Sequence, residues 1–170
     1  MQNIEAYAAT GIVRGAVVEP IMVGTSPEAA RPIAVEEATW HPLGTGADED
    51  RGHVRLPIDD VLILWADEHD LPIHARWNPV ELEIGPYRLT AELPTQPGFD
   101  PGRALSRPGG PFILLRDVRI GLVGDPGAGQ IERAHALVNR YAAERVVADI
   151  DLGYYFPGAV FAAPVGGQRA

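Results

Sequence analysis

The sequence contains no cysteine and no lysine, and all 14 of its basic residues are arginine. The absence of cysteine excludes disulfide frameworks, thiolate nucleophiles and every zinc site built on Cys. The absence of lysine excludes Schiff-base chemistry and every other form of lysine catalysis. These two absences remove several common enzyme classes before any motif is considered.

Long apolar runs are also missing, since no stretch approaches the roughly 20 residues that a membrane-spanning helix needs. The first residues lack a basic segment followed by an apolar one, which is the pattern of a secretory signal. The net charge is −9 and the isoelectric point is near 4.9. We therefore expect an acidic, soluble protein located in the cytoplasm.

The chain has 170 residues, of which 46% are hydrophobic, so it can bury a core without a metal or a disulfide. Its 16 prolines and 19 glycines are spread along the chain and leave little room for a long helix. Short segments rich in Val, Ile and Leu lie between them and are typical of strands. These are residues 11–18, 33–40, 53–58, 60–65, 80–84, 87–93, 112–123, 136–138 and 145–152. The sequence therefore predicts a mainly β protein.

Residues of the same kind recur along the chain at slowly increasing offsets. At an offset of 74 the pairs are Gly11/Gly85, Arg14/Arg88, Pro20/Pro94, Ser26/Asp100 and Pro27/Pro101; at 80 they include Ile33/Ile113 and Glu37/Asp117; at 82 they are Arg51/Arg133 and His53/His135; at 85, Val61/Val146 and Leu62/Val147. Each insertion falls where a loop is expected, and Ser26 and Asp100 each cap a short helical turn that begins at a proline. This pattern predicts an internal duplication that produces two similar small β-barrel or β-sandwich units.

The duplication divides the chain into four parts. We expect a first β unit at residues 1–72, a linker at 73–79, a second β unit at 80–152 and an apolar C-terminal extension at 153–170. A unit of this size buries little apolar area alone, so the two units are expected to pack face to face.

The second unit carries four segments that match the pattern of a known family. They are Arg88-Leu89, Arg103-Ala104-Leu105-Ser106, Phe112 to Val118 and Val138-Asn139-Arg140. In this order they resemble an uncharacterised small β domain of bacterial proteins, although Arg107 stands where that family has an aspartate. The resemblance implies a β fold, and it implies no activity, cofactor or site residue. The last of the four segments also looks like the closing strands of Sm-like barrels, which concerns shape alone.

Residues 124–129, GDPGAG, follow an apolar strand as a phosphate-binding loop would. Such a loop then needs a Lys for the phosphates and a Ser or Thr for magnesium, and here Gln130 and Ile131 follow instead. A hairpin or crossover loop explains these residues, and we expect no nucleotide or other cofactor there.

His69, Asp70 and His74 lie close enough in the sequence to supply three metal ligands. Imidazole ligands are normally held by rigid elements and by further hydrogen bonds, whereas these residues form a polar turn. We therefore predict no metal site. His53 and His135 recur at equivalent repeat positions, which favours a structural role.

Catalytic groups of other kinds are also weakly represented. Neighbouring residues of a strand point to opposite faces, so adjacent acids are not paired by spacing alone. The adjacent acids are Glu36-Glu37, Asp48-Glu49-Asp50, Asp59-Asp60 and Asp67-Glu68, and the serines are Ser26 and Ser106. Neither serine lies in a nucleophile motif, so we predict that the protein is not an enzyme.

The acidic charge is concentrated in one part of the chain. Residues 1–79 hold 5 arginines against 13 acids, whereas residues 80–170 hold 9 against 10. Four arginines of the later part could form a basic face, namely Arg103, Arg107, Arg116 and Arg119. The overall charge nevertheless argues against nucleic-acid binding and favours a basic protein partner.

The C-terminal extension contains three adjacent aromatic residues among glycines and prolines. One interpretation is an edge strand that covers the junction of the two units. The other is a partner-binding segment with Tyr154, Tyr155, Phe156 and Phe161 as protein-binding residues, because aromatic side chains anchor interface cores. We thus predict a non-enzymatic protein-binding or structural subunit of a larger assembly. The alternative is a domain that binds a small molecule in the cleft between the two β units.

Overall fold

The computed structural model describes residues 1–19, 21, 31–95 and 110–165, and these form a mainly β protein, as predicted. The strands are β1 (Gln2–Tyr7), β2 (Gly11–Val17), β3 (Ile33–Pro42), β4 (Glu49–Leu56), β5 (Ile63–Ala66), β6 (Arg76–Ile84), β7 (Tyr87–Thr95), β8 (Phe112–Leu122), β9 (Ile131–Asn139), β10 (Ala143–Ala148) and β11 (Val160–Ala162). A short 3-10 helix, η2 (Ile58–Asp60), precedes β5. Among the described residues, no helix has the length and hydrophobicity needed to cross a membrane.

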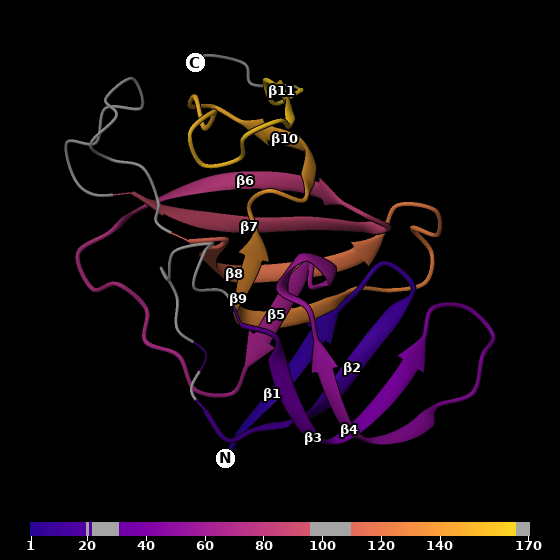
Figure 1. The fold of residues 1–170 in the computed structure, drawn as a ribbon. Coiled ribbons are helices and arrows are strands. Elements are labelled where there is room, and N and C mark those ends of the chain that lie inside the picture. The colour runs from indigo at the N-terminus through magenta and orange to yellow at the C-terminus, as the bar shows by residue number, and fades with distance from the viewer. Residues whose placement is uncertain (20, 22–30, 96–109, 166–170) are drawn as a thin grey trace.

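The strands form one 11-stranded sheet in the order β11-β10-β6-β7-β8-β9-β5-β1-β2-β3-β4 (Figure 1). The neighbouring strands are antiparallel except β10 and β11, which are parallel. In the part of the chain that the structure describes, the sheet is open and does not close into a barrel, with β4 and β11 at its two ends.

The same strand order occurs twice within this sheet. The first half (β1–β5) runs β5-β1-β2-β3-β4, and the second half (β6–β10) runs β10-β6-β7-β8-β9. The two halves meet where β5 pairs with β9, at Ile63 with Val138 and Leu64 with Leu137. The two halves are therefore joined edge to edge in one sheet, whereas the sequence predicts two separate units packed face to face.

A bulge interrupts the third strand of each half. In the first half the β2–β3 register shifts between Arg14 and Ala16, where the bulge of β3 includes Glu37. In the second half the β7–β8 register shifts between Thr90 and Glu92, where the bulge of β8 includes Asp117. Glu37 has a φ of 51° and Asp117 a φ of 50°, and they are the non-glycine residues with positive φ in the described ranges. Side chains other than glycine rarely adopt this conformation, so its occurrence at both bulges is a specific similarity between the halves.

Two hydrophobic cores lie on opposite faces of the sheet at the junction. Successive residues of a strand point to opposite faces, and in β5 the neighbours Ile63 and Leu64 enter different cores. The larger core contains Ile63 with most buried residues of the second half, and the smaller one contains Leu64 with those of the first half. Each core also takes residues from the other half, such as Tyr7 in the larger and Leu137 in the smaller. The halves consequently share their apolar burial.

The strands differ from two expectations of the sequence analysis. Residues 76–79, expected in a linker, open β6, where Val80 pairs with Ala91 in a long hairpin with β7. The C-terminal strand β11 pairs with β10 at the far end of the sheet, so it does not cover the junction of the halves. The helical turns predicted at Ser26 and Asp100 lie outside the described residues.

Candidate functional site

The junction between the halves is reinforced by side chains of β9. Asn139 donates from its backbone N–H to the Leu62 carbonyl at 2.9 Å and from its amide to the Val61 carbonyl at 3.2 Å. The His135 imidazole contacts the Ala66 carbonyl through Nε2 at 2.7 Å, with Nε2 as the donor. These bonds extend a backbone ladder of two residue pairs, so the structural role expected for His135 has a direct physical basis.

A buried carboxylate, Glu5 on β1, lies beside this junction and is 7% exposed. Arg133 of β9 donates from Nη2 to both Glu5 oxygens, at 2.9 and 2.8 Å, and Arg14 donates from Nε at 3.1 Å. The Tyr7 hydroxyl donates a further bond to Glu5 at 2.9 Å, and the Arg133 guanidinium lies 5.1 Å from the centre of the Trp65 ring. Since a buried charge is tolerated when it is paired and hydrogen-bonded, this network fixes the junction.

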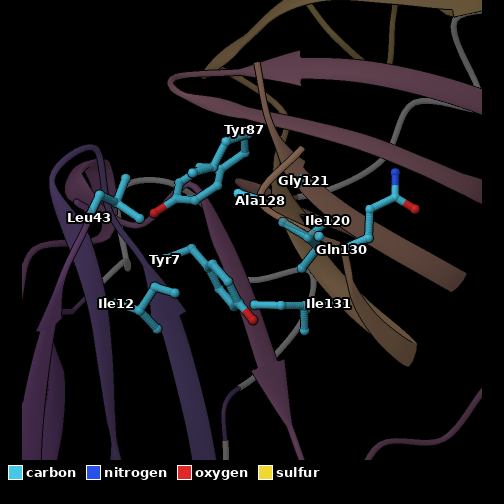
Figure 2. A pocket seen from close by; sticks show the side chains of 11 residues that line it. Tyr7, Ile12, Leu43, Tyr87, Ile120, Gly121, Ala128, Gln130 and Ile131 are labelled. Atoms are coloured by element: carbon cyan, nitrogen blue, oxygen red, sulfur yellow. The ribbon is translucent and has the colours of Figure 1, made fainter. Parts of the chain in front are cut away.

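A pocket of about 230 Å³ opens between the halves near this network (Figure 2). Its walls are Tyr7, Ile12 and Leu43 from the first half, and Tyr87, residues 120–122 and residues 128–131 from the second. The rings of Tyr7 and Tyr87 meet edge to face, with centroids 5.6 Å apart and an interplanar angle of 86°. Both halves are therefore needed to form this pocket.

The two tyrosine hydroxyls already have acceptors. Tyr87 donates to the Ala8 carbonyl at 2.7 Å, and Tyr7 donates to Glu5. Burial raises the pKa of Tyr87 far above its usual value, and burial followed by the charge of Glu5 raises the pKa of Tyr7 in the same direction. These phenols stay neutral at physiological pH and do not act as general bases.

Sequence reasoning did not identify Tyr7 or Tyr87 as site residues. Each ends or begins a strand beside a short turn, Tyr7 before residues 8–10 and Tyr87 after Gly85-Pro86. The sequence feature that could have identified these two residues is a tyrosine at the end of an apolar strand, next to a turn. Their proximity depends on how the sheet curves, which spacing does not reveal.

The glycine-rich loop at 124–129 connects β8 to β9 as an antiparallel hairpin, one of the two forms expected for it. The Ala128 N–H donates to the Asp125 carbonyl at 3.2 Å, which makes a turn inside the loop. Its end contributes Ala128, Gly129 and Gln130 to the rim of the pocket, a contact that the sequence did not predict.

The three residues considered above as metal ligands are His69, Asp70 and His74. The His69 ring lies 5.7 Å from the His135 ring, and burial, followed by the neighbouring His135 charge, lowers the His69 pKa. Asp70 lines a surface hollow together with His69, and His74 lies in the turn before β6. In the described part of the chain, no group of three or more His, Asp or Glu side chains could hold a metal ion.

The adjacent acids make pairwise contacts on the surface. Glu36 contacts His53 at 2.8 Å, and the acids of the β3–β4 hairpin pair with basic groups near them. These latter contacts are Asp48 with His41 at 2.8 Å and Glu49 with Arg51 at 2.6 Å. Asp59 and Asp60 form the first turn of η2. Ser26, Ser106, Arg103 and Arg107 lie outside the described residues.

The C-terminal segment divides into a buried part and an exposed part. Phe156 is fully buried and Tyr155 is 8% exposed, and both belong to the larger core with Leu152. Tyr154 and Phe161 are 39% and 41% exposed. Of the four predicted protein-binding residues, Tyr155 and Phe156 thus contribute to the core, and Tyr154 and Phe161 remain accessible.

Arg140 fixes this segment to the end of β9 and is 7% exposed. Its guanidinium donates to the Tyr155 carbonyl at 2.9 Å, to the Tyr154 carbonyl at 2.6 Å and to the Gly110 carbonyl at 3.3 Å. The Tyr141 ring lies 4.9 Å from the same group. The segment after Leu152 is therefore held to the sheet by a buried cation as well as by apolar contacts.

The chain matches no protein-family model, no curated protein and no solved structure. The functional argument consequently rests on the residues themselves.

Proposed function

We propose that the two halves are copies of one ancestral β unit. The repeated strand order, the bulge in each third strand and the positive φ of Glu37 and Asp117 support this origin. Duplication explains why β9 and β5, which would each be an edge strand in a single copy, pair with each other here.

We further propose that the protein is a non-enzymatic binding module that takes up an extended segment of a partner protein along β11. The observation that carries this proposal is the exposed end of the sheet. Val160 and Phe161 of β11 are 67% and 41% exposed, and among the described strands β11 has a neighbour, β10, on one side only. A strand edge with exposed apolar side chains can pair with the backbone of a partner and bind its side chains.

The charge of the chain favours a basic partner. With a net charge of −9, the protein attracts a positively charged chain and repels an acidic one. The other end of the sheet differs, because β4 carries Glu49, Asp50, Arg51 and Arg55. Charged side chains on an edge strand disfavour pairing, so β11 is the end that suits a partner.

Affinity purification from the native cell tests the proposal when the wild-type protein is compared with Phe161→Ala and Val160→Ala. Ile73→Ala is the matched control, since Ile73 is 89% exposed and lies outside every strand. We expect the two β11 variants to lose a partner that the wild type and the control both retain, with melting temperatures unchanged. Retention of the partner by both β11 variants would exclude β11 as the binding edge.

A further inference from the structure

We infer that the pocket between the halves is a binding site for a small, neutral, aromatic molecule. This site lies apart from the β11 edge, and the inference does not depend on the proposed protein partner. It rests on the size of the pocket, the chemistry of its walls and the arrangement of its two tyrosine rings.

The volume of about 230 Å³ limits the size of the ligand. A dry cavity of about 150 Å³ accommodates a benzene ring, and pockets for drug-sized ligands begin at about 300 Å³. The pocket therefore suits one aromatic ring with a short substituent.

The walls exclude a charged ligand. No charged side chain lines the pocket among the described residues, and the aliphatic side chains of Ile12, Leu43 and Ile120 form much of it. The Gln130 amide points away from the tyrosine rings (Figure 2). An ionised ligand would lose its hydration without gaining a counter-charge, so a neutral ligand is favoured.

The tyrosine rings favour an aromatic ligand over an aliphatic one. Tyr7 and Tyr87 lie nearly perpendicular to each other, so the pocket presents aromatic surfaces in two orientations. Aromatic rings pair favourably in edge-to-face and offset arrangements. Both rings are buried and held by hydrogen bonds from their hydroxyl groups, so their positions are set before a ligand binds.

The exposed residues of the pocket lining all belong to the loop between β8 and β9, so we expect the entrance on this side. Ala128 is exposed and lines the pocket, and its small side chain leaves the entrance wide. At Gly121, which also lines the pocket, an added Cβ would lie in ordinary van der Waals contact with Cγ of Gln130, at 3.6 Å. A larger side chain at Ala128 is therefore expected to block the entrance without disturbing the core.

The experiment is a titration of the full chain with benzyl alcohol, followed by NMR of the backbone amides. We expect saturable shifts at Gly121 and at residues 128–131. Two related probes test the ligand class: benzoate adds a charge, and cyclohexylmethanol removes the aromatic ring. Each is expected to bind at least about tenfold more weakly than benzyl alcohol, which corresponds to about 1.4 kcal/mol.

Ala128→Trp tests the location, and Val123→Trp is its control because Val123 belongs to the same hairpin, is 39% exposed and does not line the pocket. Ala128→Trp should weaken benzyl alcohol binding at least about tenfold, and Val123→Trp should leave it unchanged. Absence of saturable shifts, or equal affinity in the two tryptophan variants, would overturn the site. Equal binding of benzoate or cyclohexylmethanol would overturn the ligand class.

Discussion

Glu37 and Asp117 occupy the same place in the two halves, and both have left-handed backbone conformations, with φ of 51° and 50°. Each lies in the bulge of a third strand, and each is exposed. The sequence comparison had paired these two residues at an offset of 80. A left-handed backbone conformation costs energy in a residue other than glycine. Substitutions at Glu37 and Asp117 should therefore change the free energy of unfolding.

Replacing either residue by glycine should stabilise the protein. A non-glycine residue at positive φ costs about 1–2 kcal/mol, and the greater freedom of glycine in the unfolded chain offsets part of the gain. We expect Glu37→Gly and Asp117→Gly each to raise the free energy of unfolding by about 0.5–1 kcal/mol, measured by urea denaturation. Glu36→Gly is the control and should destabilise, because Glu36 has an ordinary φ and contacts His53. If Glu37→Gly lowers stability as much as Glu36→Gly, the strain argument fails.

Phe156→Ala should destabilise the protein by about 3–5 kcal/mol, because it leaves a cavity in the larger core. Phe161→Ala, in the same segment, should change stability by less than about 0.5 kcal/mol because Phe161 is partly exposed. Removal of all residues after Leu152 should be at least as harmful as Phe156→Ala. Thermal and urea unfolding of the three variants measure these effects, and an unchanged melting temperature in the truncated chain would show that the segment does not contribute to the core.

Glu5→Ala should cost about 3 kcal/mol, because it leaves the Arg133 guanidinium without its buried partner. The control is Glu132→Ala, which removes an exposed ion pair with Arg119 and should cost less than about 1 kcal/mol. High salt should weaken the effect of the control more than that of Glu5→Ala, since buried pairs are less screened. Equal losses in the two variants would contradict a stabilising role for the Glu5 network.

Acid pH should destabilise the protein in part through His69. Its pKa in the folded protein lies below the ordinary value of 6.5, so the unfolded chain binds its proton more readily. The stability gained from the neutral form is complete above pH 6.5 and is lost as the pH falls below that value. Unfolding free energies at pH 8 and pH 5 should therefore differ less in His69→Gln than in the wild type. An identical pH dependence in both proteins would exclude His69 as a contributor.

Strands in which apolar residues recur at closely spaced positions could be predicted from the sequence, and strands whose polar residues are partly or fully buried were found only in part or not at all. The segment expected at 112–123 is close to β8, because buried apolar side chains recur along it. By contrast, β1 was missed, since its short sequence contains Glu5, whose burial depends on arginines from β2 and β9. Only residues 136–138 of β9 were predicted, because its first part includes Arg133 and His135.

The residue pairs of the sequence comparison agree with the strand register in some strands and not in others. The offset of 80 matches the sheet, where Thr39 lies opposite Arg14 and Arg119 opposite Thr90. In β2 and β7, the second strand of each half, the same register places Arg14 and Thr90 at equivalent positions. Their offset is 76, whereas the sequence comparison used 74 for this strand. The preceding turns differ in length between the halves, and single residue matches do not define the register of a strand.

The site was largely beyond sequence reasoning. A pocket lies between the two halves, and the residues that line it were not identified from the sequence. They come from strands and loops far apart in the chain, and the curvature of the sheet brings them together. The aromatic C-terminal residues were recognised, yet which of them face the core depended on Arg140.

The pairing of β5 with β9 determines how the chain folds as well as how its halves are joined. Neighbours such as β8 and β9 are joined by a short hairpin, whereas Leu64 of β5 and Leu137 of β9 meet only after the long chain segment between them has closed into a loop. Closing a long loop costs entropy before its contacts contribute, which slows folding. Since hairpins can form locally, we expect the meeting of β5 with β9 to be a late and slow step. Until that step is complete, each half exposes an unpaired strand edge, so the refolding chain is most prone to aggregate during the interval before its halves join.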